Sequence, residues 1–232
     1  MEGKIIQCCY REQLGYAVYR TFYEPKLYRL AATGEWDSIP RRCQTHPAEA
    51  SFQHKYPPQD TALHRIVRVT LGPYCENEGE DGAACRSYQE LKTSATRALL
   101  DAYPEATKIT DTFGRTPLHL ACMDQYLCAK SSGETGNSAT GTCWVEAIYL
   151  QHPKAANTKD VEQRTPLHYL VARSGPFLDP RIVRLLAPPE AMRQKDVVGD
   201  TPYAVLDRRR NQVENANEIL ALLQDPPAPT HD

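Results

Sequence analysis

The sequence predicts an all-α protein of about five stacked helix pairs, and three observations support this class. A phrase that begins with threonine recurs at four places, Thr61, Thr116, Thr165 and Thr201. A proline followed closely by alanine stands 12 residues before three of these threonines, and Pro47 stands 14 before the first. Apolar residues at helical spacing fill the segments between these landmarks. One half of the unit is constant in length while the other accepts insertions, as in stacked supersecondary units with loops on one side.

A first helix is expected directly after each threonine. Thr116 is a favourable N-cap, and Pro117 suits the first helical position because its missing N–H would have no intrahelical partner there. Leu118 then begins an apolar face. Ahead of the helix, Asp111 and Gly114 supply turn chemistry, and glycine adopts a positive φ without steric cost. Each unit therefore begins with a turn and a short helix.

A second helix is expected before each proline landmark. Residues 95–103, 144–152 and 180–188 carry apolar side chains at helical spacing, and each segment stops at or just before a proline. Residues 26–50 resemble such a pair without the turn phrase, with Gly34 between the two helices. Residues 201–224 resemble a final pair with a charged outer face. The unit is therefore a turn, a helix, a loop and a helix.

The stretch from Asp111 to Ala121, DTFGRTPLHLA, resembles the ankyrin repeat, whose signature is T-P-L-H-x-A within a period of about 33 residues. Ala62 replaces proline in the first phrase, and Gln163 stands where the turn glycine is expected. The resemblance implies an ankyrin-repeat solenoid over residues 25–225. Its repeats are expected at residues 25–55, 56–110, 111–159, 160–195 and 196–225. Its structural residues would be Thr61, His64, Thr116, Pro117, Leu118, His119, Thr165, Pro166, Leu167, His168, Thr201 and Pro202.

Two long polar insertions, at residues 72–90 and 130–142, separate the first and second helices of the second and third repeats. Both are too rich in glycine, serine and charged residues to bury much apolar area, so mobile loops are predicted. Residues 1–24 are expected either to pack as an extra cap or to form a partner-binding arm, with tyrosines at Tyr10, Tyr16, Tyr19 and Tyr23. Residues 226–232 are expected to be a disordered tail.

The group Thr116, His119 and Cys122 is one arrangement of a nucleophile with its base. An active site is normally built once, however, and His64, His119 and His168 recur at one register of the phrase. The ankyrin resemblance implies that this histidine bonds to the threonine of its own phrase and to backbone of the adjoining repeat. The sequence also lacks the phosphate-binding, nucleophile-elbow and zinc-protease motifs. We therefore expect no enzyme and no catalytic residue.

Composition indicates a globular protein of the cell interior. Hydrophobic residues make up 41% of the chain and charged residues 24%, with a net charge of -2. No global field favours nucleic acid, and the short basic run at Arg208–Arg210 is expected on a solvated helix face. No apolar stretch is long enough for a membrane span, and the amino terminus lacks a signal-peptide pattern. A cytoplasmic or nuclear monomer is expected.

The eight cysteines show no repeated C-x-x-C pairing, which argues against a disulfide scaffold or a zinc ribbon. Cys43, His46 and His54 come closest to a metal-ligand set, but structural zinc prefers four well-spaced ligands. No cofactor and no metal are therefore expected. The alternative kept open is a regulatory or metal-binding subunit that uses these three residues or the two long insertions.

The expected function is that of a protein-binding adaptor or scaffold. Ankyrin proteins commonly contact partners with their turn tips and the exposed side of the first helix. Position by position, the resemblance assigns partner binding to Arg68, Phe113, Arg115, Asp124, Arg164, Arg173, Arg208 and Arg209. The six arginines outnumber the acidic residues counted on the same surface, Asp60, Asp124, Glu162 and Asp200. The expected partner is a protein with an acidic segment and an apolar or aromatic anchor, and ordinary solvated charge is the alternative for the arginines.

Overall fold

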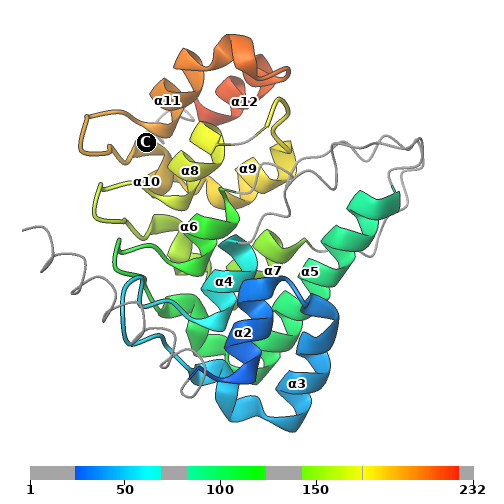
Figure 1. Cartoon of the computed structure of the whole chain (residues 1–232). Coiled ribbons are helices and arrows are strands. Elements are labelled where there is room, and N and C mark those ends of the chain that lie inside the picture. Colours follow the sequence, from blue (N-terminus) through cyan, green and yellow to red (C-terminus); the bar gives the residue numbers. More distant parts are fainter. Residues whose placement is uncertain (1–23, 69–82, 124–142, 174, 225–232) are drawn as a thin grey trace, which may run out of the picture.

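The computed structural model describes residues 24–68, 83–123, 143–173 and 175–224, with backbone alone at residues 83–89. Within these ranges the chain is mostly helical, and the one β-type feature is an isolated antiparallel bridge between Gln53 and Thr61. The predicted all-α class is therefore confirmed for the described part of the chain (Figure 1). None of the helices in this part is both long and apolar enough to cross a bilayer.

Five short helices form the first layer of the molecule. Each packs on the preceding one in the order α2, α4, α6, α8 and α11. They span Lys26–Thr33, Ala62–Arg68, Pro117–Ala121, Pro166–Arg173 and Pro202–Arg208. The last four begin directly after the repeated threonines, as the sequence predicts, and proline occupies the first helical position in α6, α8 and α11.

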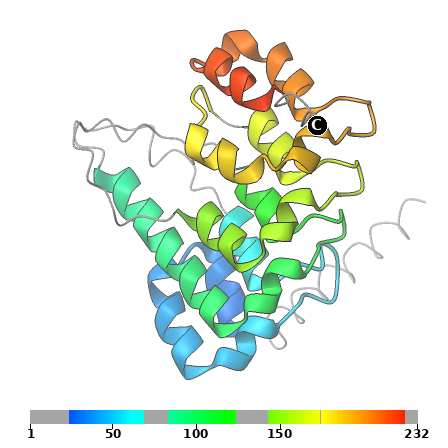
Figure 2. The same cartoon turned by 180° about the vertical axis from the view of Figure 1, so that it is seen from behind.

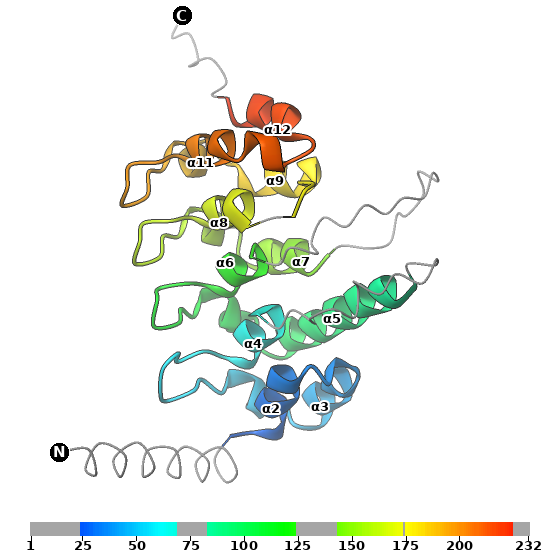
Figure 3. The same cartoon turned by 45° about the horizontal axis from the view of Figure 1, so that its top comes forward.

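Five further helices form the second layer and also pack in chain order, as α3, α5, α7, α9 and α12. They span Ile39–Thr45, Ala83–Ala102, Trp144–Gln151, Pro180–Leu186 and Ala216–Leu223. Figure 3 shows the two layers side by side, with the connecting turns projecting from the first layer. Figure 2 shows the opposite side of the molecule, where α5 extends beyond the other second-layer helices. Within the described residues the molecule is thus a row of helix pairs.

A short helical segment follows each proline landmark, which the sequence analysis did not predict. These segments are η2 (Pro47–Ser51), η3 (Pro104–Lys108), η5 (Pro153–Asn157) and α10 (Pro189–Arg193). Each buries an alanine close behind its proline, at Ala50, Ala106, Ala155 and Ala191. Proline starts the helical turn, and alanine is small enough to pack between the layers, so the pairing of the two residues has a structural reason. The connections near the first and last pairs contain two shorter turns, η1 (Trp36–Ser38) and η6 (Arg210–Gln212).

The first long insertion is shorter than predicted. Residues 72–90 were expected to form a loop, but α5 begins at Ala83, so residues 83–90 are helical. The segment after Gly82 contains neither glycine nor proline, and its alanines, arginine, glutamine and glutamate are compatible with a helix. Residues 72–82 and the second insertion, 130–142, lie outside the described residues, as do the tail at 226–232 and the amino-terminal segment apart from Glu24.

One continuous apolar core runs between the two layers. Leu118 and Leu167, which follow the threonine–proline pairs of α6 and α8, are completely buried. From the second layer, Ile148 of α7 and Val183 of α9 reach the same core and are also completely buried. Because each layer contributes apolar side chains at every level, no helix pair of the row can bury its apolar face alone.

Candidate functional site

Four turns of matching conformation project from the first layer, at residues 56–60, 111–115, 160–164 and 196–200; together they are called the turn row (Figure 3). The fourth residue of each turn has a positive φ, at Gln59, Gly114, Gln163 and Gly199. Glycine was expected at this position because of its conformational freedom, and glutamine adopts the same conformation in two of the turns. The turns therefore share one backbone shape although their sequences differ.

Backbone hydrogen bonds connect each turn to the next one. The N–H of Thr112 donates to the Pro58 carbonyl at 2.9 Å, and the N–H of Val161 donates to the Phe113 carbonyl at 3.0 Å. The N–H of Val197 continues the series by donating to the Glu162 carbonyl at 3.0 Å. In every case the second residue of one turn bonds to the third residue of the preceding turn. The turn row is therefore fixed by a repeating bond.

The recurring histidines also connect successive repeats. The Nδ1 of His119 accepts from the Thr116 N–H at 3.1 Å, and its Nε2 lies 3.1 Å from the Arg164 carbonyl oxygen. His64 makes the corresponding contact to the Arg115 carbonyl at 3.2 Å, and His168 to the Asp200 carbonyl at 3.1 Å. An acceptor at Nδ1 leaves the proton on Nε2, which donates to the carbonyl. Each imidazole is thus hydrogen-bonded both to the start of its own helix and to the backbone of the next turn.

These three imidazoles are buried, and burial lowers the pKa of His64, His119 and His168 to about 4. Each ring is therefore neutral at physiological pH. The Thr116 hydroxyl lies 2.9 Å from the Nδ1 of His119, but this contact is buried too. The Thr116–His119 pair therefore lies in the packed interior between its own helix start and the next turn.

Buried aspartates stabilise the middle turns from within. The Oδ1 of Asp160 accepts from two backbone N–H groups of its own turn, and its Oδ2 accepts from the Arg164 guanidinium at 2.9 and 3.1 Å. Asp111 and Arg115 repeat this arrangement one turn earlier. Burial alone would raise the pKa of Asp111 and Asp160, but these hydrogen bonds outweigh it and lower both pKa values. Tyr169 donates a further bond to Asp160 at 2.7 Å.

In the first turn the buried carboxylate belongs to the last residue, Asp60, and its partners lie outside the turn. The hydroxyl of Tyr28 donates to Oδ1 of the buried Asp60 at 2.6 Å, and the Arg65 guanidinium lies 2.8 Å from Oδ2. Arg68 stands between two levels of the row, 3.9 Å from the Asp60 carboxylate and 3.7 Å from the Asp111 carboxylate. Acidic and basic side chains therefore alternate along the base of the row.

This alternation corrects the predicted excess of positive charge. The count that favoured the six arginines omitted Asp111 and Asp160, whose carboxylates offset Arg115 and Arg164. From the sequence, Asp111 was expected to be a turn residue, and Asp160 was given no role. A signal was present, since arginine follows four residues after aspartate in both DTFGR and DVEQR. The carboxylates of Asp111 and Asp160 are buried, whereas the side chains of Arg115 and Arg164 are 13% and 31% exposed.

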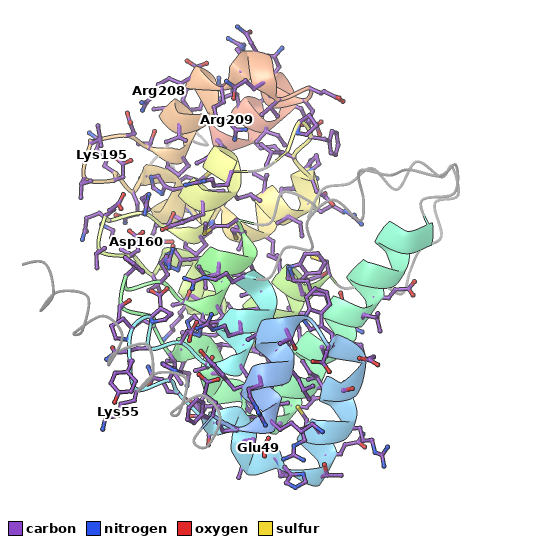
Figure 4. The ribbon with its side chains drawn as sticks, viewed as in Figure 1. Glu49, Lys55, Asp160, Lys195, Arg208 and Arg209 are labelled. Carbon is purple, nitrogen blue, oxygen red and sulfur yellow. The ribbon has the colours of Figure 1, made fainter. Side chains whose placement is uncertain are left out.

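The remaining predicted binding residues have different environments. Arg173 is exposed at the end of α8, and Arg208 is exposed while it pairs with Asp200. Arg209 is half-buried and donates to the Val171 carbonyl in the last turn of α8 at 2.6 Å. It is therefore less available to a partner. Figure 4 shows Arg208 and Arg209 on the last repeat. Asp124 lies outside the described residues.

Exposed apolar side chains mark every turn of the row. The exposed fractions are 48% for Tyr56, 51% for Phe113, 60% for Val161, 63% for Val197 and 78% for Val198. The guanidinium of Arg115 lies over the Phe113 ring at 4.5 Å. Among these residues, the sequence prediction included only Phe113. Val161 and Val197 each follow an aspartate in a turn, and an apolar residue at such a position was a signal that could have been used. The turn row is therefore an ordered surface with an apolar side chain at each level.

The three candidate metal ligands do not form a site. Cys43 is buried, and burial raises the pKa of its thiol to about 11. His54 is bonded to the Tyr56 carbonyl and to the Glu24 carboxylate, whereas His46 is exposed beside Thr45. Over the described ranges, no group of three or more histidine, cysteine, aspartate or glutamate residues is arranged to hold a metal ion.

A completely buried lysine, Lys92 of α5, is a feature that the sequence analysis missed. Its Nζ lies 4.7 Å from the ring centre of Trp144 and 5.6 Å from that of Trp36. It also donates to the Val67 carbonyl at the end of α4, at 3.4 Å. Cation–π attraction offsets part of the cost of removing the ammonium from water. Lys92 thus connects both layers beside the start of α7.

Comparison with protein-family models gives no match to the chain, and comparison with curated protein sequences gives no significant match.

Proposed function

We propose that the chain is a non-catalytic protein-interaction module of the ankyrin-repeat type, which binds another protein through the turn row and the exposed side of the first-layer helices. The turn row is the observation that carries this proposal. At each of its four levels an apolar side chain faces solvent, although the backbone beneath is held by hydrogen bonds to the neighbouring turn. A preorganised surface of this kind loses little conformational entropy when a partner binds.

Two structural features support the ankyrin-repeat assignment. The TPLH phrases place threonine at the helix start and histidine against the next turn, as at Thr116 and His119. The repeating turn-to-turn hydrogen bond then links each of these helix pairs to the next along the row. An adaptor built in this way needs neither a nucleophile nor a cofactor, because the turn row both stabilises the fold and carries the binding residues.

The chemistry of the surface favours a partner segment that combines carboxylates with an apolar anchor. Arg173 and Arg208 are exposed, and Arg164 is 31% exposed while the Asp160 carboxylate beneath it stays buried. Phe113 lies next to such a guanidinium and offers an aromatic contact. Arginine and aromatic residues are the types most enriched in interface hot spots.

The test is affinity capture from the source cells with the tagged full-length chain, quantified by mass spectrometry. The informative variant is Arg173→Glu with Arg208→Glu, because both side chains are exposed and neither holds a buried carboxylate. Reversal at Arg115 or Arg164 would be ambiguous, since it would place a glutamate against a buried aspartate and unfold the turn.

A matched control reverses the same charge elsewhere. Arg41 on α3 and Arg184 on α9 are exposed on the second layer, so Arg41→Glu with Arg184→Glu changes the net charge equally. We expect the first pair to lower recovery of specific partners at least about tenfold and the control pair to leave it within about twofold. Equal recovery with both pairs, or no enriched protein at all, would count against the proposal.

A further inference from the structure

The turn row has two different edges. In the first turn, the position that donates a backbone N–H in every later turn is occupied by Pro57, which has no N–H. In the last turn, the position that accepts is Val198, the equivalent of Pro58, Phe113 and Glu162. Among the described residues, no donor reaches the Val198 carbonyl. Within the described part of the chain, the row is therefore closed by proline at its first edge and open at its last.

We propose that an extended peptide segment of another protein docks along the open edge, with a backbone N–H donating to the Val198 carbonyl. This inference rests on the proposed function and assigns the partner's backbone conformation and point of contact. Proline at a strand edge blocks further pairing, whereas an open carbonyl at the end of a bonded series is a template for an added strand. The series Thr112, Val161 and Val197 defines the register that the segment would continue.

The side chains at this edge fit the same occupant. Val197 and Val198 are 63% and 78% exposed, so the last turn presents two adjacent apolar side chains. Apolar contact beside the backbone bond would give the complex its affinity, and the partner segment should therefore carry a β-branched or aromatic residue at the matching position. Figure 4 shows Lys195, which immediately precedes this turn, at the outer side of the molecule.

Two other occupants of the edge are disfavoured by the chain's own residues. A second copy stacked head to tail would bring Pro57 to the donor position, and proline cannot donate. A further helical repeat would rely on a histidine from the last repeat, as His64, His119 and His168 hold the turns that follow them. The corresponding residue of the last repeat is Ala204, which has no ring nitrogen.

The test begins with a random 12-residue peptide library displayed on phage and selected against the folded full-length chain. Selected peptides are synthesised with fluorescein, and their dissociation constants are measured by fluorescence anisotropy. The variant Val197→Ser with Val198→Ser should weaken binding about tenfold, because it removes apolar contact from two exposed side chains without touching the core. N-methylation of the one peptide amide that bonds to Val198 should weaken binding similarly.

Val161→Ser is the control for the Val197 substitution, and Val197→Ser alone is measured beside it. Val161 occupies the same register as Val197 and is equally exposed, but the acceptor of its turn, the Glu162 carbonyl, is already occupied by the Val197 N–H. We expect this variant to bind the peptides within about twofold of the unmodified chain. Circular dichroism of all variants confirms that they remain folded.

The outcomes separate this inference from the proposed function. Failure to select any peptide, or peptides whose affinity is unchanged by Val197→Ser with Val198→Ser, overturns the edge inference. If cellular partners are lost with Arg173→Glu and Arg208→Glu while those edge substitutions have no effect, the proposed function stands and the edge inference falls. If the edge substitutions weaken peptide binding while the arginine reversals leave the recovery of cellular partners unchanged, the edge inference is supported and the arginine surface is not the binding site.

Discussion

Replacing Asp160 with alanine should be among the most destabilising single substitutions in the turn row. The side chain is buried and accepts five hydrogen bonds. Two come from the backbone N–H groups of Glu162 and Arg164, two from the Arg164 guanidinium and one from the hydroxyl of Tyr169. Asp160→Ala removes all five acceptor contacts at once, although the Arg164 guanidinium keeps its ion pair with Glu162 and its bond to the Tyr169 hydroxyl.

The expected magnitude follows from how deeply each donor is buried. Breaking a buried ion pair by removing one partner typically costs about 3–5 kcal/mol. The side chain of Arg164 is 31% exposed, so water can solvate part of the released guanidinium and reduce the cost. Tyr169 is buried and has less access to water. We therefore expect the free energy of unfolding to fall by about 3 kcal/mol, the lower end of that range.

Asp196 provides the matched control because it occupies the same position in the last turn. Its Oδ1 accepts from the N–H groups of Val198 and Asp200, both at 2.9 Å, but the turn has no arginine at its end. Asp196→Ala should cost about 1–2 kcal/mol, the value of two partly exposed hydrogen bonds. The difference between the two variants therefore isolates the contribution of Arg164 and Tyr169.

The assay is urea unfolding at pH 7, followed by circular dichroism at 222 nm and compared through the midpoint at unchanged slope. The reasoning is refuted if Asp160→Ala and Asp196→Ala shift the midpoint equally, since the ion pair would then contribute nothing measurable. A loss below about 1 kcal/mol for Asp160→Ala would lead to the same conclusion.

Three further predictions concern the histidines, the core and the turn backbone. Burial lowers the pKa of His64, His119 and His168 to about 4, below the unfolded value of about 6.5, so the unfolded chain binds more protons between these values. Stability should be full above pH 6.5 and fall as pH drops toward 4, by at most about 1.4 kcal/mol per pH unit and histidine; midpoints independent of pH in this window would contradict the burial argument. Leu118→Ala should cost about 2–5 kcal/mol because Leu118 is completely buried, and a midpoint shift worth under about 0.5 kcal/mol would mean that its surroundings collapse without penalty. Gln163 has a φ of 60°, so Gln163→Gly should raise stability by about 0.5–1 kcal/mol, and a lowered midpoint would show that side-chain contacts outweigh the backbone strain.

The elements that the sequence predicted are those whose signals are local. Threonine followed by proline marks a helix start within two residues, and the predicted starts of α6, α8 and α11 are confirmed. Gly114 was expected at positive φ for the same reason, and it has a φ of 72°. At Gln163 the local signal is absent, yet the turn is the same, because bonds to both neighbouring turns determine its backbone.

The features that sequence reasoning missed depend on contacts between distant residues. Nothing near Lys92 shows that Trp36 and Trp144 will lie on either side of its ammonium group, since these residues are more than fifty positions apart on each side. The charge balance of the surface was misjudged for a related reason. Asp111 was interpreted from its turn role and Asp160 was not considered, whereas the second carboxylate oxygen of each accepts from an arginine side chain. The order of residues does not show which rotamer makes this contact.

The arrangement around Lys92 also makes intrinsic tryptophan fluorescence a probe of how cooperatively the protein unfolds. The chain has two tryptophans, and both lie beside this one ammonium group, so indole emission originates from one location between α5, α7 and η1. Circular dichroism instead averages over every helix. In a row of units coupled only to their neighbours, the ends can unfold before the centre. Superimposed fluorescence and dichroism transitions would show that the row unfolds as one body, and separated transitions would reveal an order of unfolding without any added label.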